Sequence, residues 1–208
     1  MIPQFILFTV WAYLLGSVPA AYLIMKWTRG VDIRKVGTGK SGASNVLSAG
    51  PKWAVVPVAL FDVGKGALVV WLAQLVGLNP WQQLVVGFGA IIGHNWPVYL
   101  GFKSGGRGVF ASLGVIFVLS WKVGLFALIF PYLFAPVKQV ALGVFLAFLA
   151  LGFVGWYIGG PYDDGAKLPA IVGFIAIAVL GISRRLLVRR TEISKKSPWR
   201  KIIINRLL

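Results

Sequence analysis

Residues 2–25 read IPQFILFTVWAYLLGSVPAAYLIM, an uninterrupted run without a charged side chain. About 20 apolar residues suffice for an α-helix to cross a bilayer. The run is long for a signal peptide and only one residue precedes it, so we expect a spanning helix. Similar runs recur, and 58% of the 208 residues are hydrophobic while 12% are charged. Because the period-two alternation of a β-barrel is missing, the sequence predicts an all-α, polytopic membrane helix bundle.

The apolar runs predict seven transmembrane helices. They lie at residues 2–25, 53–77, 82–100, 109–120, 122–136, 139–158 and 168–183. The fourth and fifth are short for a span, and dropping both gives five helices, the alternative that we keep. Fusing them would give six and would move the basic C-terminus across the membrane, which the charge rule disfavours. We divide the chain into a transmembrane bundle, 1–183, and a basic cytoplasmic tail, 184–208.

The net charge of +16 is unevenly distributed. Four segments carry it, namely 26–52, 101–108, 136–138 and 184–208. With seven spans, all four lie on one side of the membrane. By the positive-inside rule that side is cytoplasmic, so we expect the N-terminus outside and the C-terminus inside. This placement argues against a nucleic acid partner. It favours contact with anionic membrane lipids, either through a tail that lies on the leaflet as an interfacial helix or through a tail that only fixes topology.

Two glycine-rich basic segments interrupt the apolar runs. They read GTGKSGASN at 37–45 and GFKSGGRG at 101–108. Glycine lets backbone N–H groups approach a ligand closely, and lysine or arginine adds a countercharge. We therefore expect phosphate binding, the alternative being flexible loops whose charge sets topology. A nucleotide P-loop is excluded, because it needs an α/β domain and a glycine where this chain has Arg34.

Asp62, Lys65 and His94 are ionisable residues within the predicted spans. Asp62 and Lys65 are three residues apart and so share one helix face. They form either a structural ion pair or part of a site in which Lys65 is drawn towards phosphate. His94, the only histidine, is either satisfied by a backbone carbonyl or acts as a base or a hydrogen-bond donor to phosphate. It has no neighbouring carboxylate in the sequence, and the chain has no cysteine, so no metal centre is expected.

Two pairs of glycines and one pair of aspartates give further predictions about helix packing and about a turn. The spacing Gly89-x-x-x-Gly93 predicts close helix packing, as does Gly155-x-x-x-Gly159. Asp163 and Asp164 lie on the charge-poor side, and we expect an exposed turn there.

Four motifs resemble those of the bacterial acyl-phosphate:glycerol-3-phosphate acyltransferases. They read YLLGSVP at 13–19, DIRKVGTGKSGASNV at 32–46, FDVGKG at 61–66 and GHNWPVYLGFK at 93–103. The resemblance covers nearly the whole chain, and the last motif is highly specific. It implies seven helices with the N-terminus outside, in the bacterial inner membrane, and an active site that faces the cytoplasm.

The resemblance also implies a reaction. A fatty acyl group moves from acyl phosphate to the 1-hydroxyl of glycerol 3-phosphate, which gives lysophosphatidic acid in the first step of phospholipid synthesis. No cofactor, metal or coenzyme A is implied. The soluble enzyme that makes acyl phosphate is an implied partner.

The motifs and the loop chemistry together give a candidate site. We expect catalytic roles for His94 and Asn45, with a substrate phosphate as the alternative proton acceptor. The expected substrate- and phosphate-binding residues are Thr38, Gly39, Ser41, Gly42, Ser44, Lys65, Lys103, Gly105, Gly106 and Arg107.

Some positions depart from the family pattern. Ser104 is an inserted residue, Arg107 replaces the usual lysine, and Ser48 replaces an arginine. Arg184 and Arg185 follow the last apolar run without the family's usual histidine and asparagine. The departures leave two alternatives open, a paralogue with a different phospholipid-related substrate and a non-enzymatic anion- or lipid-binding membrane protein.

Overall fold

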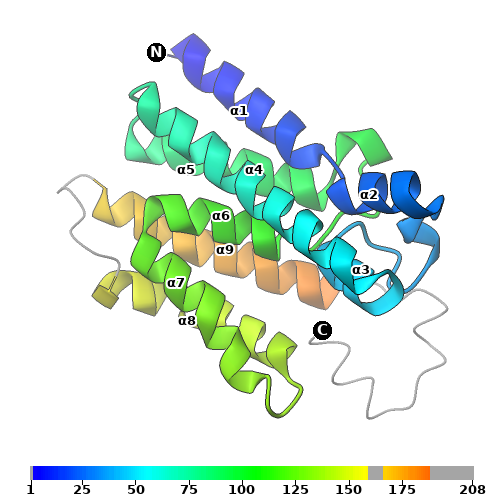
Figure 1. Cartoon of the computed structure of the whole chain (residues 1–208). Coiled ribbons are helices and arrows are strands. Elements are labelled where there is room, and N and C mark those ends of the chain that lie inside the picture. The colour runs from blue at the N-terminus through cyan, green and yellow to red at the C-terminus, as the bar shows by residue number, and fades with distance from the viewer. Residues whose placement is uncertain (1, 159–165, 188–208) are drawn as a thin grey trace.

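The computed structural model describes residues 2–158 and 166–187, and within them the chain is helical with no strand. The α-helices are α1 (Ile2–Ser17), α2 (Ala20–Arg29), α3 (Ala43–Ala49), α4 (Val55–Leu75), α5 (Pro80–Asn95), α6 (Val109–Leu119), α7 (Trp121–Ile129), α8 (Val140–Ile158) and α9 (Lys167–Leu187). Short 3-10 helices are η1 (Ile33–Lys35), η2 (Lys52–Ala54), η3 (Val98–Leu100) and η4 (Phe130–Phe134). The long helices run side by side (Figure 1).

Each of the seven predicted spans contains a helix, but the first is not continuous. It breaks between α1 and α2 at Val18 and Pro19, where the proline has no N–H to donate. The span predicted at 82–100 also ends early, because Pro97 disfavours helical backbone at the residue before it. Within residues 2–158 and 166–187, four segments are long and apolar enough to cross a membrane, Ile2–Arg29, Lys52–Leu75, Val140–Ile158 and Lys167–Arg185. Since the first of these contains the break, the number of crossings stays a prediction.

Glycines let the long helices pack closely, as the spacing predicted. A Cβ on Gly89 would meet Thr9 and Ala12 of α1, and one on Gly93 would meet Tyr13 and Ser17. Close packing of α5 on α1 is therefore confirmed. Gly155 of α8 packs against Phe174 of α9, whereas Gly159 lies outside the described residues.

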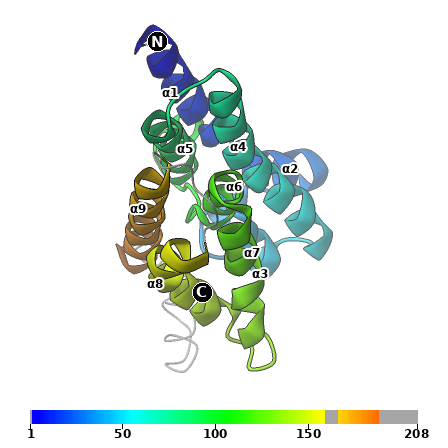
Figure 2. The same cartoon turned by 90° about the vertical axis from the view of Figure 1, so that its left-hand side faces the viewer.

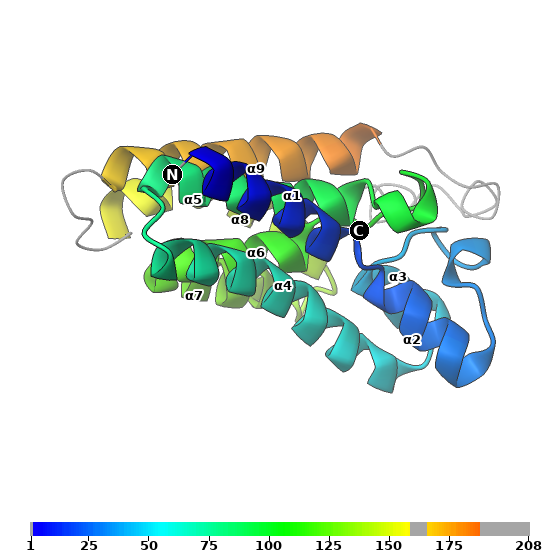
Figure 3. The same cartoon turned by 90° about the horizontal axis from the view of Figure 1, so that it is seen from above.

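Successive long helices run in opposite directions, so distant loops meet at one end of the bundle. Figures 1 and 3 show α2, α3 and the segment that follows α5 gathered at the end where α9 finishes. Figure 2 shows α6 at the centre, and its residues Ala111, Val115 and Ile116 are buried. Because α9 continues to Leu187, Arg184 and Arg185 belong to a helix and not to the predicted tail. Asp163, Asp164 and residues 188–208 lie outside the described part of the chain.

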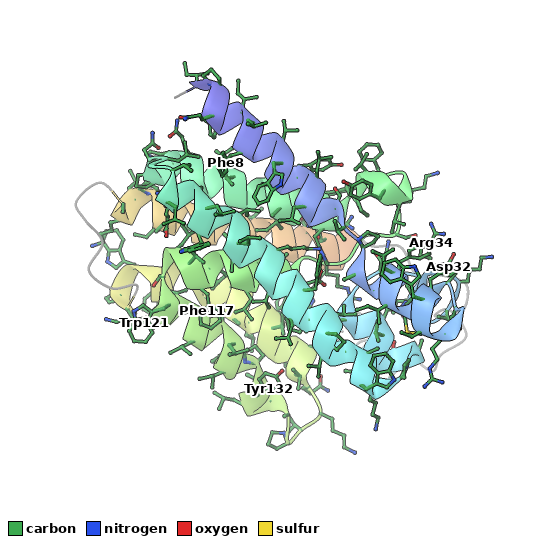
Figure 4. All side chains as sticks on the ribbon, turned by 45° about the horizontal axis from the view of Figure 1, so that its top comes forward. Phe8, Asp32, Arg34, Phe117, Trp121 and Tyr132 are labelled. Carbon is green, nitrogen blue, oxygen red and sulfur yellow. The ribbon has the colours of Figure 1, made fainter. Side chains whose placement is uncertain are left out.

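The basic segment 26–52 is more ordered than the loop that we expected. It contains the end of α2, then η1 and α3. Asp32 caps η1 by accepting the backbone N–H of Arg34, and Figure 4 labels the two side chains next to each other. Their ion pair measures 2.8 Å, and this hydrogen bonding lowers the pKa of Asp32 to about 2. A rigid turn therefore leads from α2 into the first glycine-rich loop.

Candidate active site

The two glycine-rich loops are joined directly. Ser41 donates both its backbone N–H and its hydroxyl to the carbonyl oxygen of Ser104, each over 2.8 Å. Ser104 has a φ of 58°, a left-handed conformation that is uncommon for a residue with a side chain. The inserted residue of the second loop is thus the one that binds the first loop. Ser41 was expected to bind phosphate, and the structure instead shows its hydroxyl linking the loops.

Asn45 holds the first loop in shape. Its side chain is fully buried, and Oδ1 accepts the backbone N–H of Thr38 over 2.7 Å. Nδ2 lies within hydrogen-bond distance of the carbonyls of Ile33, Val36 and Lys40, at 3.0, 3.1 and 2.9 Å. The amide is therefore occupied by the backbone of its own loop. This geometry gives Asn45 a positioning role, and the catalytic role that we expected for it stays a prediction.

The second loop is pressed against the end of α5. Gly106 donates its N–H to the carbonyl of His94 over 3.1 Å. A Cβ on Gly106 would clash with the imidazole of His94, and one on Gly105 would clash with the carbonyl of Asn95. Glycine is required at both positions because of this close approach. The predicted phosphate-binding glycines therefore lie directly over His94.

A buried charge cluster, made of Asp62, Lys65 and His94, lies beneath this loop. The ammonium of Lys65 is 2.8 Å from Asp62 Oδ1, 3.0 Å from His94 Nδ1 and 3.3 Å from the carbonyl of Val18. Three protein acceptors thus use the three N–H bonds of Lys65. This favours the ion-pair interpretation over the expected contact of Lys65 with phosphate. His94 also has a carboxylate nearby, since Asp62 Oδ1 is 3.3 Å from its Nδ1, a proximity that the sequence did not reveal.

The contact of Nδ1 with the ammonium of Lys65, which can only donate, favours one tautomer of His94. When Nδ1 accepts a hydrogen bond from Lys65, the ring proton of the neutral imidazole is on Nε2. Nε2 is also the ring atom that a Cβ on Gly106 would meet, so it faces the second loop. Of the two functional roles expected for His94, the geometry favours the hydrogen-bond donor over the base.

Three cations converge at this end of the molecule. Arg184 reaches in from α9, where Nη2 donates to the carbonyls of Asn95 and Gly106 over 2.8 and 3.2 Å. Its guanidinium also stacks on the ring of Trp96, 4.4 Å from the centroid. Burial, followed by repulsion from Arg184 and Arg107, lowers the pKa of Lys40, and burial lowers the pKa of Arg107. Crowded cations of this kind are stabilised by an anionic ligand.

The lowered pKa of Lys40 predicts a pH effect. Lys40 loses its charge at a lower pH than an exposed lysine, whose pKa is about 10.4. An anion then binds more weakly as the pH rises. We expect KM for a phosphate substrate to rise on the alkaline side at a lower pH in the wild type than in Lys40→Arg, whose guanidinium stays charged. Initial rates from about pH 7 to about pH 10, corrected for hydrolysis without enzyme, measure this. Parallel profiles would contradict it.

The structure brings most of the predicted site residues together. Thr38, Gly39, Ser41, Gly42 and Asn45 belong to the first loop and the start of α3, and Gly105, Gly106 and Arg107 to the second loop. Ser44 and Lys103 are exposed.

Sequence reasoning missed three residues of this region, Lys40, Asn95 and Arg184. Lys40 was included in the first glycine-rich segment but not among the expected binding residues, and Asn95 appeared only within the motif at 93–103. Arg184 was placed in the tail. An asparagine at the end of an apolar run and an arginine in the last turn of a spanning helix were the available signals.

An apolar cavity of about 120 Å³ opens beside the second loop, between α6, α7, η4 and α8. Val109 and Phe110 line it at the end next to Gly108. Leu113, Val144 and Phe148 line it farther along. The cations therefore lie at one end of a space that is suited to a hydrocarbon chain.

Joined glycine loops, crowded cations and an adjacent apolar cavity suit a ligand that carries both a phosphate and a hydrocarbon chain. A family model for glycerol-3-phosphate acyltransferases matches residues 6–192. The chain belongs to this family. The resemblance seen in the motifs is thereby confirmed, and so is the expected enzyme class, an acyltransferase.

Relatives of the family align over most of the chain. "Glycerol-3-phosphate acyltransferase 5" of Dehalococcoides mccartyi is 41% identical over 203 residues, 98% of this chain and 87% of that protein. A glycerol-3-phosphate acyltransferase of a Synechococcus species is 42% identical over 168 residues, 81% of this chain and 71% of that protein. The crystal structure of PlsY, an integral membrane glycerol 3-phosphate acyltransferase, in its glycerol 3-phosphate form aligns with a TM-score of 0.76 at 31% identity, over 92% of this chain and 98% of that one. Together with the apolar helices, this shows a membrane protein.

Proposed function

We propose that this enzyme transfers a fatty acyl group from acyl phosphate to the 1-hydroxyl of glycerol 3-phosphate and releases lysophosphatidic acid and inorganic phosphate. This is the first step of phospholipid synthesis. Family membership supports acyl transfer to glycerol 3-phosphate, and solved PlsY structures are described in glycerol 3-phosphate and lysophosphatidic acid forms. The observation that carries the proposal is the set of three cations, Lys40, Arg107 and Arg184, at the joined loops beside an apolar cavity.

The chemistry asks for positioning more than for a reactive side chain. Acyl phosphate is a mixed anhydride, so the acceptor hydroxyl attacks its carbonyl carbon, a new ester C–O bond forms, and the C–O bond to phosphate breaks. The hydroxyl proton passes to an oxygen of the departing phosphate. The loop cations hold the phosphates, while Nε2–H of His94 is placed to stabilise negative charge that develops beside Gly106. The apolar cavity holds the acyl chain.

The proposal includes an orientation in the membrane. Three of the four basic segments, 26–52, 101–108 and the end of α9, meet at the end of the bundle that carries the site. The positive-inside rule then supports a site that faces the cytoplasm, an N-terminus outside and seven crossings of the bacterial inner membrane. A cytoplasmic site is accessible to a soluble enzyme that makes acyl phosphate, and anionic lipids would contact the basic end.

Purified protein with palmitoyl phosphate, with and without glycerol 3-phosphate, tests the reaction. We expect phosphate release that depends on glycerol 3-phosphate, with lysophosphatidic acid as the organic product. Lys103→Ala should lower kcat/KM by about 10-fold, because one charge-assisted contact contributes about 1.5 kcal/mol.

Lys52→Ala, which removes an exposed lysine from η2, is the matched control and should keep full activity. Equal activity of Lys103→Ala would remove that residue from the site. If a folded sample released no phosphate in response to glycerol 3-phosphate, the reaction itself would be refuted, and a donor and acceptor screen would then test the paralogue alternative.

A further inference from the structure

Unpartnered polar atoms concentrate at one place in the structure. Among the described residues, five buried side-chain nitrogen or oxygen atoms have no hydrogen-bond partner. All five belong to four residues, Asn95, Arg107, Arg184 and Arg185. Buried polar atoms in native proteins are nearly always hydrogen-bonded, because each unpaired one carries an uncompensated desolvation cost. A concentration of them in one region therefore indicates a ligand site.

Hydrogen bonds and close contacts place these residues together. Nη2 of Arg184 donates to the carbonyls of Asn95 and Gly106, and Gly106 directly precedes Arg107. Asn95 is 1% exposed, and a Cβ on Gly108 would meet its side-chain amide. Asn95 is therefore buried between the end of α5 and the second loop, with Arg184 across from it. Nη1 of Arg185, which follows Arg184 in α9, donates to the carbonyl of Ala141 on α8 over 2.8 Å.

The unpaired atoms differ in hydrogen-bonding character. Nε of Arg184, Nη1 of Arg107 and Nδ2 of Asn95 are donors, and two of them belong to cations. Oδ1 of Asn95 is an acceptor. The donors suit a phosphate dianion, for which arginine is the preferred partner. The lone acceptor suits a hydroxyl group on the same ligand.

We infer that Asn95, Arg107 and Arg184 bind the acceptor substrate, with the guanidinium groups on its phosphoryl group and Asn95 Oδ1 on one of its hydroxyls. This inference rests on the proposed function, which supplies glycerol 3-phosphate as that acceptor. A fatty acyl phosphate carries a phosphoryl group but no hydroxyl, so it leaves Asn95 Oδ1 unpaired. The ligand class is a small phosphate monoester with a free hydroxyl, and Arg184 of α9 is a substrate-binding residue contributed by the last helix.

Steady-state kinetics distinguish the two phosphate-bearing substrates. In Arg184→Gln and Arg184→Lys we expect KM for glycerol 3-phosphate to rise about 10- to 100-fold, since the planar fork of the arginine is lost in both. KM for palmitoyl phosphate should stay within about 3-fold. Arg29→Gln removes an exposed arginine from the same end of the molecule, and it should change neither constant. An unchanged KM for glycerol 3-phosphate, or a rise confined to palmitoyl phosphate, would overturn the inference.

Asn95→Leu separates a ligand-binding role from a structural one. A structural asparagine stabilises the protein, so its loss would lower Tm. An amide that is unpaired without ligand has the opposite effect, and we expect Asn95→Leu to match or exceed the wild-type Tm without ligand. Glycerol 3-phosphate should raise the Tm of the wild type more than inorganic phosphate does, because only the former brings a hydroxyl. Asn95→Leu should lose that difference.

The KM and Tm measurements distinguish a failure of the binding inference from a failure of the proposed reaction. If the wild type catalyses acyl transfer while Arg184→Gln and Asn95→Leu keep normal KM values and Tm shifts, the inference fails and the proposed function stands. If the wild type is inactive but glycerol 3-phosphate raises its Tm more than inorganic phosphate does, and Asn95→Leu loses that difference, the binding site stands and the proposed reaction fails. A Tm of Asn95→Leu well below that of the wild type would show that Asn95 stabilises the fold. The proposed contact of Asn95 with a substrate hydroxyl would then be wrong.

Discussion

Replacing Gly106 with alanine is expected to lower kcat/KM by about 100-fold or more while the protein still folds. A Cβ at this position would clash with the imidazole of His94, and that ring is held by Lys65 and packed at 7% exposure. Since the ring has little room to move, the loop must shift instead. A displacement of about 1 Å of the groups that position a substrate costs about 100-fold in rate. Initial rates with palmitoyl phosphate and glycerol 3-phosphate measure the loss.

Gly64→Ala is the matched control. Gly64 lies in α4 next to Lys65, and a Cβ there meets nothing within 4 Å. Alanine is the better helix former, so this variant should keep its activity and unfold at the same or a higher temperature. Near-normal activity of Gly106→Ala would show that the second loop does not have to lie against His94. The conclusion that position 106 must be glycine because it lies against His94 would then be wrong.

Replacing Asp62 with asparagine is expected to destabilise the protein by about 3–5 kcal/mol. The side chain of Asp62 is buried and accepts a 2.8 Å bond from Lys65, which is itself 3% exposed. Removing the carboxylate leaves the ammonium buried without its countercharge. The penalty comes from the unpaired charge more than from the lost bond. Thermal unfolding of the detergent-solubilised protein, followed by circular dichroism, measures it.

The double variant Asp62→Asn with Lys65→Met tests the cause. Removing both charges removes the unpaired ion, so most of the lost stability should return. If the double variant were as unstable as the sum of both single variants, the two residues would act independently and the ion pair would not explain the effect. Activity of the double variant reports separately on His94, because Nδ1 then loses its donor from Lys65 and the tautomer is no longer fixed.

Contacts of Ser104 and Arg184 bear on two of the departures from the family pattern. The inserted Ser104 supplies the carbonyl that accepts both bonds from Ser41, so the insertion connects the loops instead of disrupting them. The histidine and asparagine that usually follow in the family are missing after Arg184. Arg184 nevertheless reaches the second loop, where it donates to the carbonyl of Gly106. Ser48 donates its hydroxyl to the carbonyl of Asn45 within α3, and nothing in the structure explains the loss of arginine there.

The sequence alone determined the helices and the composition of the loops. Uncharged runs near 20 residues have few stable alternatives to a membrane helix, because every backbone polar group must be satisfied within the segment. The spacing of Gly89 and Gly93 predicted close packing, because two glycines one turn apart leave a helix face without side chains and let a neighbouring backbone approach. The glycines and cations of the two loops predicted phosphate binding, because anions bind to backbone amides and cations in any fold. The break at Pro19 was not predicted, because proline is tolerated often enough in membrane helices that the run 2–25 was predicted as one span.

Only the tertiary structure decided which of these groups are free. Asp62 and His94 lie on different helices, and their proximity follows from the packing of α4, α5 and the second loop. Asn45 and Lys65 carry the right chemistry for a site, but their donors are used by Ile33, Val36, Lys40, Asp62, His94 and Val18. Asn95 and Arg184, by contrast, are distant in sequence and meet with atoms left unpaired. Sequence specifies which donors and acceptors exist, whereas their saturation is a property of three-dimensional contacts, and unsaturated groups are the ones that can bind a substrate.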